Sequence, residues 1–200
     1  PPTTSPSTCR LRCLPSSVLR QFLDDTEIAA LVNEHSKLEQ FIEDTYQTWV
    51  ETQTERCTQL LFVDIGHGFI HPYLKRRLID RGIPEHELAF AQDANSDEQK
   101  AHLFRRVRQG DVRILCGSTP TIGAGTQIPD RLKVLRHLDC PLRPTDRWQR
   151  DGRILRPGNM HSEVEIVSYV TTGKPYQNEE NKQIQGLSPD SYLYEVNVRK

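Results

Sequence analysis

The spacing of apolar residues changes part-way along this chain of 200 residues. Between Ser17 and Glu55 apolar side chains recur every three or four positions, which predicts two amphipathic helices. A polar break near residues 34–36 separates them, and Ser36 is well placed to cap the second helix. A continuous apolar run at residues 59–66 then predicts a short buried strand that ends at a glycine.

Strand-like and helix-like segments alternate from there onward. Strands are predicted at residues 59–66, 87–92, 111–117, 133–139 and 163–170, and helices at residues 72–81, 97–109 and 149–155. Glycines follow the first two helices, at the position where helices commonly end. This alternation predicts an α/β fold in which helices cover both faces of a parallel sheet.

The first 172 residues divide into three segments by composition. Residues 1–17 are rich in Pro, Ser and Thr and are typical of a linker, so we expect the chain to have been cut from a longer protein. Residues 18–55 form a helical lead-in, and residues 56–172 form the α/β lobe. With 36% hydrophobic residues overall, the chain can bury a core.

Several classes of protein are excluded or disfavoured. No apolar run approaches the roughly 18 residues that a membrane helix needs, and no signal peptide is visible. The cysteines are odd in number and scattered, without zinc-site spacing, so we expect no metal site and a reduced, cytoplasmic location. They are Cys9, Cys13, Cys57, Cys116 and Cys140.

Charge is unevenly distributed, although the net charge is only −1. Residues 131–156 hold eight basic residues against three acidic ones, and seven of the eight are arginines. Arginine suits phosphate better than lysine does, because its planar fork donates two parallel hydrogen bonds. This favours a phosphate-binding site, with a solvated basic face as the alternative.

Two segments follow predicted strands and could bind phosphate. Residues 117–130 combine glycines, including Gly125, with hydroxyl side chains, including Ser118, Thr119 and Thr126, although a plain turn has the same composition. Residues 146–159 carry Arg150, Arg153 and Arg156 at intervals of three. On a helix they would share one face and could meet one polyanion, or simply form a solvated face.

Other catalytic motifs are missing from the sequence. There is no Walker A loop, no strand-terminal acid pair of the Walker B type, no G-x-S-x-G and no H-E-x-x-H. Asp64 ends a predicted strand, but as a lone carboxylate it is interpreted as structural. The chain therefore has no evident means of holding Mg-nucleotide for hydrolysis by itself.

Three of these segments resemble helicase motifs. The pattern Gln149-x-x-Gly152-Arg153-x-x-Arg156 resembles motif VI of superfamily-two helicases and Swi/Snf-type DNA translocases. Residues 118–126 resemble their motif V, and residues 60–63 resemble the strand of motif IV. Between about residues 36 and 170, the sequence is similar to large helicase-like proteins of phages and mobile elements, which are often joined to an adenine-N6 DNA methylase.

This resemblance implies the second RecA-like lobe of a two-lobe motor, in which ATP binds between the lobes. The first lobe, elsewhere in the full-length protein, would hold the nucleotide and its Mg²⁺. Arg153 and Arg156 match the arginine fingers that stabilise charge on the γ-phosphate when the cleft closes. In the same motif, Gln149 would contact the nucleotide or motif V, and Arg150 would contact the nucleotide.

The motif V residues would link the nucleotide to the DNA track. Gly125 and Thr126 fall inside this motif, and Gln127 lies near the position of a ribose-binding acid in many relatives. Ser118 and Thr119 would contact a DNA phosphate, independently of base sequence. We therefore expect duplex DNA as a partner.

The sequence departs from the family at several positions. The family usually has His, Trp and Gln where this chain has Gln92, Leu142 and Pro157, and none of these is a finger position. Residues 173–200 then comprise an insertion and a segment that resembles the start of a C-terminal helix.

The leading hypothesis is a fragment of an ATP-dependent helicase or translocase that is inactive as an ATPase alone. The alternative is a nucleic-acid-binding scaffold that kept the fold but lost the motor activity. A free-standing phosphate-ester enzyme is a weaker third hypothesis, because no cluster of metal ligands is evident in the sequence.

Overall fold

The computed structural model describes residues 36–64, 68–122, 130–171, 176–177, 183–184 and 188–199. Its α-helices are α4 (Lys37–Glu51), α5 (Ile70–Asp80), α6 (Asp97–Gln109), α7 (Thr119–Ile122), α8 (Pro144–Asp151) and α9 (Pro189–Arg199). Its strands are β1 (Thr58–Phe62), β2 (Leu88–Phe90), β3 (Ile114–Gly117), β4 (Leu132–His137), β5 (Glu165–Ser168), β6 (Tyr176–Gln177) and β7 (Gln183–Ile184). Two 3₁₀ turns, Glu85–Glu87 and Ala91–Asp93, flank β2.

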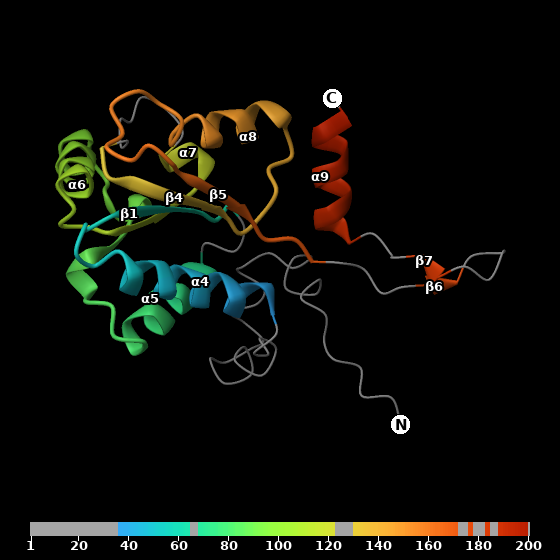
Figure 1. Ribbon diagram of the computed structural model, residues 1–200, viewed down its shortest axis with the longest axis horizontal. Coiled ribbons are helices and arrows are strands. Elements are labelled where there is room, and N and C mark those ends of the chain that lie inside the picture. Colours follow the sequence, from blue (N-terminus) through green and yellow to red (C-terminus); the bar gives the residue numbers. More distant parts are fainter. Residues whose placement is uncertain are drawn as a thin grey trace.

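Five of the strands form one parallel sheet, as the alternating pattern predicts. Their order is β2-β3-β1-β4-β5, so β1 lies at the centre, paired with β3 on one side and β4 on the other. The predicted α/β fold, with helices on both faces, is confirmed (Figure 1). β6 and β7 form a separate antiparallel pair.

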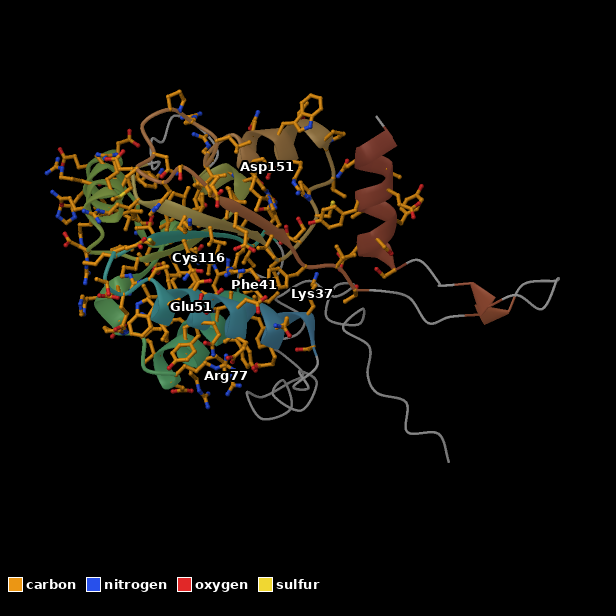
Figure 2. The ribbon with its side chains drawn as sticks, viewed as in Figure 1. Lys37, Phe41, Glu51, Arg77, Cys116 and Asp151 are labelled. Atoms are coloured by element: carbon orange, nitrogen blue, oxygen red, sulfur yellow. The ribbon has the colours of Figure 1, made fainter. Side chains whose placement is uncertain are left out.

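Each face of the sheet has its own hydrophobic core, because successive side chains of a strand point to opposite faces. Leu61 of β1 packs with Phe41 and Leu74 under α4 and α5. Leu60 and Phe62 of the same strand face the other way, into the core beneath α6 and α7. Figure 2 shows Phe41 and Asp151 on opposite sides of the sheet.

The signals that begin and end the predicted helices act as expected. Ser36 caps α4, since its hydroxyl accepts a hydrogen bond from the backbone N–H of Glu39 at 3.1 Å. Gly82 and Gly110, which follow α5 and α6, have φ angles of 100° and 82°. The first predicted helix, within residues 18–33, lies outside the described residues.

The last predicted helix is misplaced. We expected it at residues 149–155, but α8 spans Pro144–Asp151. Proline at the first helical position supplies a preset φ angle and needs no N–H partner, which favours the earlier start. After Asp151 the helix gives way to a tighter turn, in which N–H groups bond to carbonyls three residues earlier. The Arg153 N–H donates to the Arg150 carbonyl, and the Ile154 N–H donates to the Asp151 carbonyl.

The C-terminal helix α9 docks beside α8 (Figure 1). Lys37, at the start of α4, forms an ion pair with Asp190 of α9 at 2.9 Å, and both side chains are largely buried. Arg147 of α8 stacks over the ring of Tyr194, and Asn197 donates to the Pro141 carbonyl. Within the described ranges, none of the helices is both long and apolar enough to cross a membrane.

Candidate nucleotide-side edge of the sheet

Three strands end side by side at the carboxyl edge of the sheet and bring polar residues together there. Asp64 follows β1, Thr119 follows β3, and Asp139 follows β4. The Asp64 carboxylate accepts hydrogen bonds from the N–H and the hydroxyl of Thr119, at 2.7 and 2.8 Å. The Asp64 N–H in turn donates to the Asp139 carboxylate at 2.6 Å. The sequence analysis interpreted Asp64 as a lone carboxylate with a structural role. It is not alone, because the Asp139 carboxylate lies beside it, but its hydrogen bonds are to protein groups, as expected of a structural residue.

Arg150 lies at the centre of this group and is fully buried. Its guanidinium donates to Asp64 at 2.5 Å, to Asp139 at 3.2 Å and to the Thr119 hydroxyl at 2.8 Å. It also lies over the Phe62 ring, 4.9 Å from the centroid. Arg150 thus ties α8 to the loops after β1, β3 and β4. Its predicted contact with nucleotide stays a prediction, since the guanidinium is engaged here by protein groups.

A second layer of contacts holds the end of α8. His137 Nε2 and an Asp151 carboxylate oxygen lie 2.7 Å apart, and Arg147 donates to the other oxygen at 2.8 Å. Burial lowers the pKa of His137 to about 4, despite the opposing effect of Asp151. Burial acts to raise the pKa of Asp151, but the bonds to His137 and Arg147 outweigh it and lower that pKa. At neutral pH, His137 is therefore neutral and Asp151 is ionised.

The two predicted finger arginines lie just beyond α8, in the turn after Gly152. They do not share a helix face, so the predicted row of arginines on one helix is wrong. Arg153 is 5% exposed, whereas Arg156 is exposed. Burial lowers the pKa of Arg153, and the charge of Arg156 lowers it further. The buried side chain of Ile154 anchors the turn in the core.

The remaining predicted site residues lie on α8, just before α7 or outside the described residues. Gln149 is exposed on α8. Ser118 is buried, and its N–H donates to the Thr121 hydroxyl at the start of α7. Gly125, Thr126 and Gln127 lie outside the described residues. The nucleotide and DNA contacts assigned to all of these residues stay predictions.

The arginine-rich stretch at residues 131–156 does not act as one basic surface. Arg136 is 3% exposed and donates to the Tyr169 hydroxyl and to the Asp44 carbonyl. It therefore connects α4 to the sheet. Like Arg150, it is buried and hydrogen-bonded to groups inside the protein. Sequence reasoning missed Asp139 and His137, whose signal was their position at the end of a strand.

Comparison with solved structures identifies the fold. A structure of the DUF1998 helicase MrfA bound to DNA matches with a TM-score of 0.57 and 16% identity, over 84% of this chain and 22% of that one. The S. cerevisiae protein Dbp5 bound to RNA and ADP BeF3 matches with the same TM-score and identity, over 84% and 36%. The C-terminal part of the Fun30 ATPase domain matches at 0.53 and 14%, over 92% and 60%.

These similarities are found in the structure and not in the sequence. No protein-family model matches the chain, and no curated protein is detectably similar in sequence. The chain spans only about a fifth of the MrfA chain and about a third of the Dbp5 chain. The five-stranded parallel sheet with its two helical layers is a RecA-like α/β fold, which the chain shares with these solved structures.

Proposed function

We propose that this chain is the second motor lobe of an ATP-dependent helicase or translocase. A first RecA-like lobe in the same full-length protein would hold ATP and Mg²⁺, and Arg153 and Arg156 would reach the γ-phosphate as the lobes close. The observation that carries the proposal is the position of this arginine pair. It lies in the turn directly after Asp151, whose carboxylate contacts His137 where β4 ends. Ligands of open α/β sheets bind at that edge.

The contacts of Arg150 support this role indirectly. Because Arg150 is locked against Asp64, Asp139 and Thr119, the end of α8 is held in a fixed position. A finger arginine needs such a support, since its effect depends on placement to within about 0.5 Å. Arg150 would then act as a positioning residue rather than as a contact to nucleotide.

The proposed partner of this lobe is a nucleic acid. MrfA is described as bound to DNA and Dbp5 as bound to RNA. We propose duplex DNA, bound through its backbone near Ser118, Thr119 and the following loop, because motif V and the Swi/Snf-like pattern resemble those of DNA translocases. The kinship with phage helicase-methylase proteins rests on the sequence segments alone.

The test is ATP turnover in a protein that joins this chain to its first lobe. Arg153→Ala and Arg156→Ala should each lower kcat at saturating DNA by about a thousandfold or more. Arg105→Ala, an exposed arginine on α6, serves as the matched control and should leave kcat unchanged. The scaffold alternative is favoured if both variants hydrolyse ATP normally but bind DNA more weakly.

A further inference from the structure

Three potential metal ligands meet at the opposite, amino-terminal edge of the sheet. Glu55 and Cys57 immediately precede β1, and His161 lies in the loop before β5. A carboxylate oxygen of Glu55, the Sγ of Cys57 and a ring nitrogen of His161 all lie within 4.8 Å of one another. The strand that separates this group from the Asp64–Arg150 group is five residues long, which corresponds to roughly 16 Å.

We propose that Glu55, Cys57 and His161 form a binding site for a single Zn²⁺ ion. Thiolate, imidazole and carboxylate are the three ligand types that zinc uses in proteins. Hard cations such as Mg²⁺ and Ca²⁺ prefer sets made only of oxygen, so the cysteine and histidine disfavour them. Three protein ligands leave the fourth tetrahedral position to water or to another donor.

The spacing of the donor atoms suits this ion. Cys57 Sγ lies 3.3 Å from a Glu55 carboxylate oxygen, as a hydrogen-bond donor to it. Zinc holds sulfur at about 2.3 Å and nitrogen or oxygen at about 2.0–2.2 Å, so tetrahedral ligand atoms are roughly 3.3–3.8 Å apart. The sulfur–oxygen pair is already at this distance, and only the His161 side chain has to move closer.

The imidazole of His161 provides a second, independent observation. Its Nε2 atom is buried, yet it makes no hydrogen bond with any residue in the described part of the chain. A buried ring nitrogen without a partner is costly, and metal binding is one way to satisfy such an atom. The other two side chains supply the negative charge that a divalent cation needs.

The backbone holds both halves of the site in place. The Thr58 N–H, next to Cys57, donates to the Arg131 carbonyl at 2.8 Å. On the other side, Asn159 donates to the Leu132 carbonyl at 2.7 Å and accepts from the His161 N–H at 3.0 Å. Both halves are therefore fastened to the start of β4, and little reorganisation is needed to bind the ion.

Binding would exchange the thiol proton of Cys57 for the metal. The thiolate is the form of cysteine that binds zinc, so the proton leaves to solvent when the ion binds. The bound ion would cross-link the loop before β5 to the residues that precede β1.

The test is titration of the 200-residue chain with Co²⁺ followed by displacement with Zn²⁺. Cys9 and Cys13 are replaced by serine in all proteins compared, so that their thiols contribute nothing. One equivalent of Co²⁺ should bind and produce a thiolate charge-transfer band, and one equivalent of Zn²⁺ should abolish it. Cys57→Ala should eliminate the band, and His161→Ala should weaken binding at least about tenfold.

Matched controls separate this site from other thiols and imidazoles. Cys140→Ala removes a buried thiol far along the chain, and His102→Ala removes an exposed imidazole on α6; neither should change the band or the affinity. His161→Ala changes a loop side chain outside both cores, so it remains informative if Cys57→Ala fails to fold. The proposal is overturned if no band appears, or if the band and the affinity survive in His161→Ala.

Discussion

Arg150 donates to the Asp64 carboxylate across 2.5 Å, although 86 positions separate the two residues in the sequence. The guanidinium is fully buried, and Asp139 receives a second hydrogen bond from it at 3.2 Å. Burial raises the pKa of Asp139 and the charge of Arg150 opposes that rise. One cation is therefore shared by two adjacent carboxylates at the edge where the proposed nucleotide would lie.

Arg150→Met should destabilise the lobe strongly. The replacement keeps much of the side-chain volume but leaves Asp64 and Asp139 without their shared cation, which costs about 3–5 kcal/mol for a buried group. The free energy of unfolding, from urea denaturation of the chain, measures this. The double variant Arg150→Met/Asp139→Asn should recover part of the loss, because one of the uncompensated charges is gone. A loss below about 1 kcal/mol in the single variant would contradict the role of Arg150 as a structural tie.

Stability should fall with acidification because of His137. Its pKa is about 4 in the folded chain and about 6.5 when unfolded, so the unfolded chain binds the proton more readily between these values. The His137 contribution is complete above about pH 6.5 and is lost as the pH falls towards 4, by about 3 kcal/mol in all. The charged groups around the ring are Asp151, Arg147 and Arg150.

The measurement for His137 is the free energy of unfolding against pH in the parent chain and in His137→Gln. Carboxylates titrate in both proteins, so the difference between the two curves isolates the imidazole. The parent should lose stability more steeply than the variant below about pH 6.5. Parallel curves over that range would show that the imidazole is not buried in its neutral form.

Two glycines offer a matched pair for backbone strain. Gly82 and Gly110 both have positive φ, but a Cβ at Gly82 would meet nothing within 4 Å, whereas one at Gly110 would lie 3.1 Å from the Arg56 carbonyl oxygen. Both alanine variants should lose about 1–2 kcal/mol because of the left-handed conformation. Gly110→Ala should lose more, because Arg56 also donates two hydrogen bonds to the Gly110 carbonyl. Thermal unfolding of the two variants decides this, and equal losses would argue against the close contact.

The isolated chain should show negligible ATPase activity. The sequence contains no Walker A loop and no strand-terminal acid pair, so nothing in it is suited to holding Mg-nucleotide. Phosphate release is measured with and without duplex DNA, and the lobe-joined protein serves as the positive control. Strong DNA-stimulated hydrolysis by the chain alone would refute its assignment as a second lobe.

The sequence by itself determined the α/β class and most of the element positions. The reason is that these depend on local signals: apolar runs for buried strands, period-3.6 patterns for helices, and terminal residues such as Ser36 and Gly110. The helix α6 lies at the predicted residues 97–109. The α8 boundaries were missed because the arginine spacing suggested a helix where the chain in fact turns.

Only the tertiary structure decided what each charged residue does. Arginines look alike in the sequence, but their surroundings differ in the fold. Arg136 donates to the Asp44 carbonyl and Arg150 to the Asp139 carboxylate, whereas Arg156 is exposed. Likewise, the grouping of Asp64 with Asp139 and that of Cys57 with His161 depend on strand order, β3-β1-β4-β5. Strand order brings together residues about 75 to 104 positions apart, and no local pattern encodes such a contact.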